Sequence, residues 1–225
     1  MDTEKQVKGN DKRIASCKKI GGKKKALGHE IEKLFTKQYN NKALNEPTEY
    51  RPQADTKMNE EHPTYKKVKK ELKLRGTSAS NKSGMSIQCT LGNIPEMKNI
   101  EVHELTTQKV REIFDKYLKK STSLVPANIL VYCDNVTNKW IFFNMDDVVN
   151  YIAEKCIWRK LESGRIKGDF KDETKKGFSQ YITYEYRTGH KGYFLGFNGG
   201  KGKKFIELLM SATYGIKYYC DNIDS

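Results

Sequence analysis

Two apolar runs joined by a polar turn constrain the fold of this chain more than any other feature. ANILVYCD, at residues 127–134, is a short apolar run of the kind that forms a buried strand. KWIFFN, at 139–144, follows the turn NVTN and is typical of the second strand of a hairpin. Asn144 is then expected to cap a helix over MDDVVNYIAEKC, whose two aspartates lie in the first turn, where the helix dipole favours them. This strand–strand–helix unit indicates an α/β fold, and we expect Trp140, Phe142 and Phe143 to pack in its core.

Further helices and strands are predicted on both sides of this unit. KALGHEIEKLFTKQYN carries apolar residues at helical spacing and predicts a helix from Lys25 to about Tyr39. A second helix is expected over 106–120, capped by Thr106 or Thr107. KKFIELLMSATYG predicts a closing helix, whereas RPQADTKM, MSIQCTLG, YITYEYR and GYFLGF predict strands. Without an internal repeat or a clear linker, the simplest architecture is α/β, a central mixed β-sheet flanked by helices in a single domain over 25–225.

The segment YKKVKKELKLRG fits two patterns. Apolar residues occupy even-numbered positions, namely Val68, Leu72 and Leu74, and charged residues occupy the odd-numbered ones. This alternation predicts a strand over 67–75. Val68 and Leu72 are also four residues apart, so a short helix is the alternative. We interpret GTSASNKS at 76–83 as a turn. The stretch WRKLESGRIKGDFKDETKKG is polar, basic and glycine-containing, and we interpret SGRIKGDF within it, at 163–170, as a glycine-flanked turn.

The charge of the chain favours a polyanionic partner. Lys and Arg number 42 and Asp and Glu 28 among 225 residues, so the formal charge is +14. The excess is clustered: residues 1–25 carry nine cations against three acids, and 187–204 carry five against none. We interpret 1–24 as a flexible basic arm. Nucleic acid is the first candidate, because clustered cations gain free energy by releasing counterions from phosphates. A membrane is not expected, because no basic amphipathic helix has an apolar Trp, Phe and Leu face.

Several classes of protein are excluded by missing motifs. No apolar run approaches the roughly 20 residues that span a bilayer, and the N-terminus has no signal-peptide core. Five scattered cysteines without a CxxC predict an intracellular, reducing environment in the cytoplasm, or in a nucleus or viral setting. The glycine-rich FNGGKGKKF lacks the P-loop pattern, and the histidines lack zinc spacing.

Three carboxylates and a lysine form the best candidate for chemistry: Glu32, Asp55, Glu71 and Lys73. On a strand, Glu71 and Lys73 would project from the same face, two residues apart. That arrangement places an oxygen ligand beside a cation. Mg²⁺ takes hard oxygen ligands, and a neighbouring lysine can orient water or stabilise a phosphate in the transition state.

The chain contains, in this order, a helix with Gly28-x-x-Ile31-Glu32, then Asp55, then Glu71-x-Lys73. In this order of motifs it resembles the PD-(D/E)XK nucleases. ELKLRGTSASNKSGMSIQCTLGNIP is most similar to the corresponding segment of MvaI-like and MutH-like restriction endonucleases. The resemblance implies a mixed sheet flanked by helices, dependence on Mg²⁺ and cleavage of double-stranded DNA. It also implies that Asp55 and Glu71 bind metal, that Lys73 serves the water and that Glu32 supports the site. Asp55 follows Ala54 rather than a proline, and Glu60 or Glu61 is the alternative first acid.

DNA contacts are predicted outside this catalytic set. We expect the catalytic core to occupy about 25–120 and the DNA-contacting part about 121–225. The candidate contacts are Lys82, Gln88, Arg165, Lys167, Arg187, His190, Lys191, Lys201, Lys203 and Lys204. Lys82 would reach the scissile phosphate, Gln88 would read an adenine, and Arg165 and Lys167 would lie on a glycine-flanked turn.

The leading hypothesis is therefore a sequence-specific, Mg²⁺-dependent DNA endonuclease that acts as a monomer or homodimer. Two alternatives remain open, a non-catalytic basic nucleic-acid-binding protein and a nicking or repair nuclease of the same fold.

Overall fold

The computed structural model describes residues 22, 26–39, 42–43, 56–83, 100–114, 127–162, 166–170, 179–187, 192–197, 202–211 and 215–224. Its elements are a helix over 26–39, β1 (Lys42–Ala43), β2 (Thr56–Lys57), α2 (Pro63–Leu72), β3 (Ser78–Ser83), the 3-10 helix η2 (Val102–Glu104), α3 (Thr107–Phe114), β4 (Ile129–Asp134), β5 (Lys139–Asn144), α4 (Met145–Lys155), β6 (Cys156–Lys160), β7 (Ile166–Phe170), β8 (Ser179–Arg187), β9 (Gly192–Phe197), α5 (Gly202–Met210) and β10 (Tyr218–Asn222). The expected arm over 1–24 lies outside the described residues, apart from Gly22, which is helical.

Within these segments the strands form two sheets. The larger sheet has the order β1-β2-β3-β4-β5-β10, and the smaller sheet has the order β6-β7-β8-β9. The larger sheet is mixed, because β3 and β4 run parallel while its other neighbouring strands are antiparallel. None of the described helices combines the length and apolar character needed to cross a membrane. The predicted class, α/β with a mixed sheet flanked by helices, is confirmed.

The central hairpin of β4 and β5 is buried on both faces. Successive side chains of a strand point to opposite faces, so β4 places Ile129 and Val131 in one apolar cluster and Leu130 and Tyr132 in another. The first cluster joins the sheet to α2 and the helix over 26–39, and the second joins it to α3, α4, α5 and β7. A strand buried on both faces reads as a continuous apolar run, which is why 127–134 shows no polar alternation.

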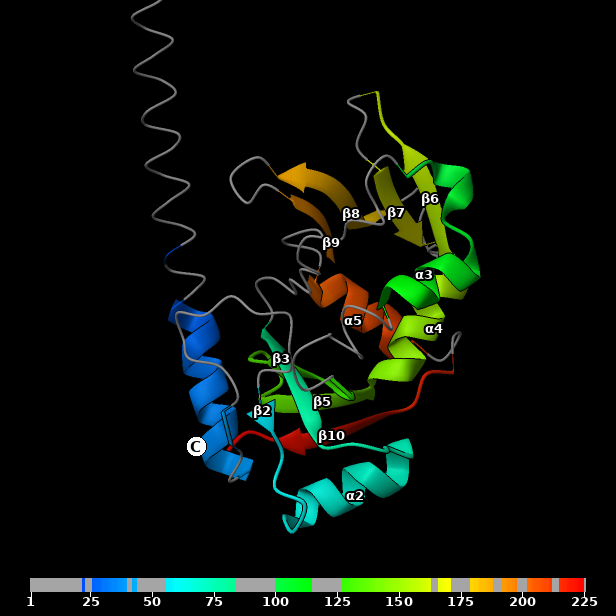
Figure 1. Cartoon of the computed structure of the whole chain (residues 1–225). Coiled ribbons are helices and arrows are strands. Elements are labelled where there is room, and N and C mark those ends of the chain that lie inside the picture. The colour runs from blue at the N-terminus through cyan, green and yellow to red at the C-terminus, as the bar shows by residue number, and fades with distance from the viewer. Residues whose placement is uncertain are drawn as a thin grey trace, which may run out of the picture.

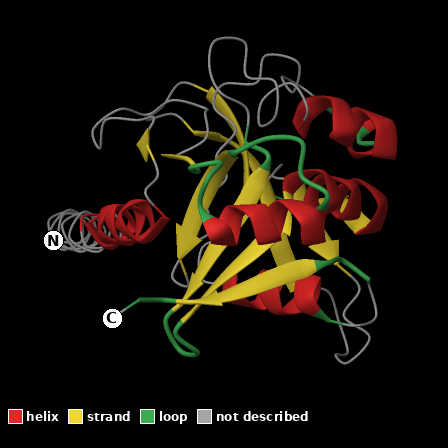
Figure 2. Ribbon diagram, turned by 90° about the horizontal axis from the view of Figure 1, so that it is seen from below, coloured by secondary structure: helices red, strands yellow, loops and turns green. Residues whose placement is uncertain are grey.

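These contacts produce a layered molecule. Figure 1 shows α2 on one side of the larger sheet, α4 and α5 on the other, and the smaller sheet beyond them. Figure 2 shows helices on both sides of the strands from a second direction. Phe205 of α5 packs 5.4 Å from Phe170 of β7, measured between ring centroids, and so connects the helical layer to the smaller sheet.

Most elements predicted around the hairpin are confirmed. The Oδ1 atom of Asn144 accepts a hydrogen bond from the backbone N–H of Asp146 at 2.8 Å, which is the expected cap of α4. Thr106 Oγ1 likewise accepts from the N–H of Lys109 at 3.2 Å, at the start of α3. Trp140 is fully buried, as are Phe142 and Phe143. The second half of the helix expected over 106–120 and the strand expected in MSIQCTLG lie outside the described residues.

Two polar segments predicted as turns contain strands instead. GTSASNKS contains β3, and SGRIKGDF, at 163–170, contains β7. Small and charged residues weaken the intrinsic preference for a strand, but pairing with neighbouring strands overrides that preference. β3 lies between β2 and β4, and β7 lies between β6 and β8.

A polar clamp fastens the helix over 26–39 to the sheet and to the C-terminal segment. Gln38 Oε1 accepts hydrogen bonds from Trp140 Nε1 at 2.6 Å and from the N–H of Asp224 at 3.1 Å. Gln38 Nε2 donates to the carbonyl of Asn222 at 2.8 Å. One side chain therefore satisfies a buried indole and two backbone groups of the C-terminal segment, which is far from Gln38 in the sequence.

The substitution Gln38→Ala is expected to destabilise the protein by about 1–3 kcal/mol, because it leaves the Trp140 N–H buried without its acceptor. Urea unfolding of wild type and variant measures the difference. Lys37→Ala, at an exposed position of the same helix, is the control and should change stability by less than about 0.5 kcal/mol. Equal losses in the two variants would contradict the role of the clamp.

Tyr39 makes the stability sensitive to alkaline pH. Burial and the adjacent Asp221 carboxylate, which accepts the Tyr39 hydroxyl at 3.0 Å, raise the pKa of Tyr39 far above its usual value. Tyr39 ionises near pH 10 in the unfolded chain but stays neutral in the folded protein. Its contribution to the free energy of unfolding is therefore fully present below about pH 10 and is lost as the pH rises further. Above that pH the stability of wild type should fall more steeply than that of Tyr39→Phe, by up to about 1.4 kcal/mol per pH unit. Equal slopes of the unfolding free energy against pH in wild type and Tyr39→Phe would contradict this prediction.

Candidate functional site

The segment that carries Glu71 and Lys73 is the end of a helix. α2 begins at Pro63, and His62 caps it by accepting a hydrogen bond at Nδ1 from the N–H of Thr64 at 3.2 Å. A proline in the first turn is a common helix start, because its missing N–H has no intrahelical partner there. Tyr65, Val68 and Leu72 are buried against the sheet. The four-residue spacing of Val68 and Leu72 therefore reflects a helix, and the strand predicted over 67–75 is wrong.

This helix changes the geometry of the proposed catalytic pair. Glu71 is exposed on the last turn of α2, and Lys73 is the C-cap residue with left-handed backbone angles of φ 52° and ψ 43°. The N–H of Lys73 donates to the carbonyl of Lys69 and closes the helix. The two side chains do not share one face of a strand, so the argument that placed an oxygen ligand beside an ammonium group fails here. Their catalytic roles stay predictions.

Glu71 and Lys73 line a polar cleft of about 420 Å³. Its other lining residues come from the end of β5, from α4 and from the segment before β10: Asn144, Asp147, Asn150, Tyr151, Glu154, Lys155, Gly215, Ile216 and Lys217, together with Leu72. Asn144 Nδ2 donates to the carbonyl of Leu72 at 3.0 Å and so fixes the end of α2 against the start of α4.

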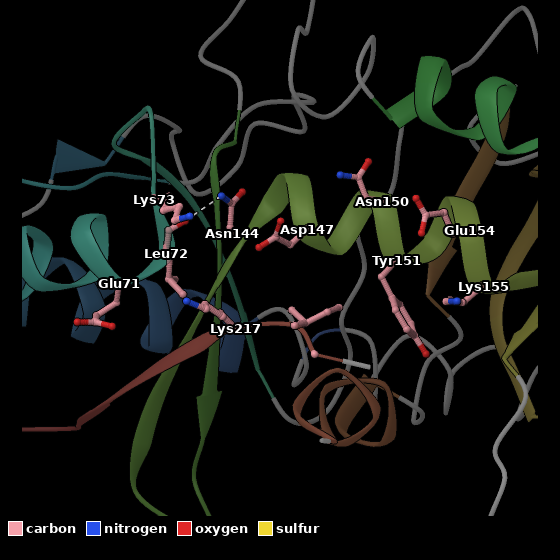
Figure 3. Close-up of a pocket in the computed structure, with 12 residues that line it drawn as sticks. Glu71, Leu72, Lys73, Asn144, Asp147, Asn150, Tyr151, Glu154, Lys155 and Lys217 are labelled. Carbon is pink, nitrogen blue, oxygen red and sulfur yellow. Dashed lines mark hydrogen bonds between the residues drawn. The ribbon is translucent and has the colours of Figure 1, made fainter. Parts of the chain in front are cut away.

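The charges of this cleft are mixed. Figure 3 shows Glu71 at one edge, with its carboxylate directed away from Asp147. Partial burial and the neighbouring Asp146 raise the pKa of Asp147. Among the described residues no group of three or more His, Cys, Asp or Glu side chains is placed to hold a metal ion. The cleft has polar groups of both signs but no assembled metal centre within the described segments.

The other predicted acids lie in separate places. Glu32 lies on the helix over 26–39, where its Oε2 atom is 3.9 Å from Nδ1 of His29. Asp55 lies outside the described residues and directly precedes Thr56 of β2 in the chain. Glu61, one of the alternative acids, pairs with Lys66 at 2.7 Å, and this hydrogen-bonded cation lowers the pKa of Glu61. Glu60 is exposed in the same turn before α2.

Lys82 lies in β3 rather than in a turn. β3 pairs antiparallel with β2, in the register Thr56 to Ala79, and parallel with β4, in the register Lys82 to Tyr132. At Lys82 the backbone of β3 pairs with β4, whereas the pairing of β3 with β2 is at Ser78 and Ala79. The signal in the sequence was the apolar run of β4, which requires a neighbouring strand on each side when it is central to a sheet.

The predicted DNA contacts are distributed over the second half of the chain. Lys167 lies in β7 and is buried, so its placement on a glycine-flanked turn is wrong. Arg187 ends β8, and Lys203 and Lys204 lie in the first turn of α5. Gln88, Arg165, His190, Lys191 and Lys201 lie outside the described residues.

One buried ion pair was missed by the sequence analysis. Asp169, fully buried in β7, accepts a hydrogen bond at Oδ2 from Arg159 Nε at 2.6 Å. Within the described segments, Oδ1 of Asp169 has no hydrogen-bond partner. The pair connects β6 to β7 beside a register shift at Gly168 and Asp169. The alternation of charged and apolar residues in IKGDF could have indicated this strand.

No protein family, curated protein or solved structure matches this chain significantly.

Replacing Lys73 by glycine is expected to stabilise the fold. A side chain in the left-handed region costs about 1 kcal/mol relative to glycine, which adopts this conformation freely. Lys73→Gly should therefore raise the urea midpoint, and Arg75→Gly, at an exposed neighbouring position, should not. A loss of stability in Lys73→Gly would mean that its side chain makes stabilising contacts that outweigh the relief of strain.

Proposed function

We propose that this protein is a Mg²⁺-dependent endonuclease that hydrolyses phosphodiester bonds in double-stranded DNA at specific sequences. The net charge of +14 suits a polyanionic substrate. The mixed sheet between helical layers is compatible with the PD-(D/E)XK resemblance. The observation that carries the proposal is the position of Lys82 in β3, adjacent to the strand that directly follows Asp55.

The register of β2 and β3 supports this choice of lysine. The strands are antiparallel, so moving back along the chain from Thr56 corresponds to moving forward from Ala79 in β3. Lys82 is three residues beyond Ala79, and the peptide bond keeps the Cα atom of Asp55 within about 3.8 Å of that of Thr56. On this proposal, Asp55 and Lys82 take the roles that the E-x-K motif gave to Glu71 and Lys73. Glu71 and Lys73 form the second candidate arrangement.

The donor chemistry fits Mg²⁺. Asp55 would supply a carboxylate ligand, and Glu32 would support the site from the helix over 26–39. When bound, Mg²⁺ lowers the pKa of its water and offsets charge at the phosphate. The Lys82 ammonium would stabilise the negative charge that develops on the phosphate oxygens, which is worth most where water is excluded.

A non-catalytic nucleic-acid-binding protein is the second candidate. It is favoured by the helical setting of Glu71 and Lys73, which do not share one strand face as the E-x-K interpretation required. Such a protein would bind duplex DNA through its basic segments and leave it intact.

Digestion of a plasmid with and without Mg²⁺ tests the proposal. Wild type should give discrete fragments, and Asp55→Asn and Lys82→Ala should each lower the cleavage rate by at least about 10²-fold while retaining DNA binding. Lys73→Gly is the matched control, because it removes the ammonium group of the alternative pair and is expected to leave the fold intact.

The outcomes separate the candidates. If cleavage is lost in Lys73→Gly and Glu71→Gln but retained in Asp55→Asn, the reaction centre is assigned to the cleft beside α2 instead. A mobility shift with no cleavage by wild type in Mg²⁺ would reject the nuclease and favour the binding protein.

A further inference from the structure

The solvent face of α2 is the most concentrated basic surface on a single described helix. Residues 60–75 contain six cations against three acids. The helix buries Tyr65, Val68 and Leu72, so the lysines lie on the opposite, exposed side. At about 100° per residue, Lys70 points most directly away from the buried stripe, with Lys67 beside it.

Most of these cations have no acidic partner. Lys66 pairs with Glu61 at 2.7 Å. In contrast, none of the following forms an ion pair with another residue in the described segments: Lys67, Lys69, Lys70, Lys73 and Arg75. Lys69 Nζ lies 6.0 Å from the centroid of the Tyr65 ring. A set of exposed cations without acidic partners gains most from an external anion, because little of their charge is neutralised within the fold.

The spacing of these cations favours an extended polyanion. From Lys67 to Lys73 the helix rises by about 9 Å at about 1.5 Å per residue, a length over which duplex DNA carries several phosphates. The apolar residues of α2 face the sheet, which leaves no side chains on this surface to insert into a bilayer. A nucleic-acid backbone therefore fits the surface better than a membrane.

We propose that the exposed face of α2, centred on Lys67 and Lys70, binds the phosphate backbone of duplex nucleic acid at a surface separate from the proposed reaction centre. Figure 1 shows α2 on the outer side of the larger sheet, away from α5 and the smaller sheet. Five residues connect the end of α2 to Ser78, and Lys82 lies about 13 Å further along β3. The inference rests on the proposed function only for the choice of DNA as the probe. It gives the protein a second, sequence-independent contact with its substrate.

The test compares two charge-reversal variants of the full chain. Lys67→Glu/Lys70→Glu removes the centre of the α2 face. Lys33→Glu/Lys37→Glu makes the same change of charge at exposed positions of the helix over 26–39, which covers the same face of the sheet. Binding to a fluorescent duplex of about two helical turns is measured in EDTA over a range of salt concentrations, so that cleavage cannot interfere.

The α2 variant should bind at least about tenfold more weakly than the control variant, and the slope of log K against log salt should fall by about 2. Lys67→Gln/Lys70→Gln, which keeps good helix formers, should show a smaller loss in the same direction. Circular dichroism should show an unchanged fold in all three.

Equal weakening in the α2 and control variants, or none in either, would overturn the inference. It would also be overturned if the α2 substitutions abolished binding to phosphatidylserine vesicles and left DNA binding unchanged. Binding that depends on α2 without any cleavage in Mg²⁺ would retain this inference and reject the nuclease, whereas cleavage with α2-independent binding would do the reverse.

Discussion

The burial of the β4–β5 hairpin on both faces is the constraint on which the rest of the structure depends. Alternate side chains of these two strands enter different apolar clusters, so neither face can be left to solvent. Each face requires its own covering layer. α2 and the helix over 26–39 supply one layer, and α3, α4 and α5 supply the other. The layered architecture follows from this requirement rather than from the preferences of individual helices.

The covering layers are fixed in place by a few polar contacts. Gln38 connects the helix over 26–39 to Trp140 and to the C-terminal segment. Gly76 lies so close to Asn128 that an added Cβ atom would come within 2.2 Å of its side-chain nitrogen. The backbone N–H of Asn128 donates to the carbonyl of Ser78 at 2.8 Å, and its carbonyl accepts from the N–H of Met145 at 3.0 Å. The starts of β3, β4 and α4 therefore meet at one junction.

How far the sequence predicts the structure depends on how local the signal is. The hairpin, the cap at Asn144 and the helix over 26–39 were all predictable, because each depends on residues within one element. β3 was not, because SASNKS has the small, polar composition of a turn and becomes a strand only by pairing with β2 and β4. α2 was ambiguous for a different reason, since Val68 and Leu72 satisfy a strand parity and a helix period together.

The candidate site illustrates the consequence of that ambiguity. Residues i and i+2 share a face on a strand but are about 200° apart on a helix. The change from a strand to a helix therefore removes the shared face that the E-x-K interpretation required. The register of β2 and β3 pairs Thr56, which follows Asp55 in the chain, with Ala79 of the strand that carries Lys82, the lysine proposed in place of Lys73. The sequence could not supply that register, because sixteen residues separate Asp55 from Glu71 and the folding of α2 between them decides which strand comes next.

The pairing of β3 is relevant to the proposed catalytic role of Lys82. A catalytic side chain must be held in place by structure that does not rearrange when substrate binds. β3 pairs with β4 from Ala79 to Ser83 and with β2 at Ser78 and Ala79, and its start is hydrogen-bonded to Asn128 at the junction with β4 and α4. Lys73, by contrast, ends a helix in the left-handed region and depends on a single backbone hydrogen bond to Lys69. A basic helix end of this kind would suit contact with a mobile phosphate backbone, and a strand paired with β4 along most of its length would suit a fixed reaction centre. On the proposed function, the two lysines would therefore serve different tasks on the same DNA.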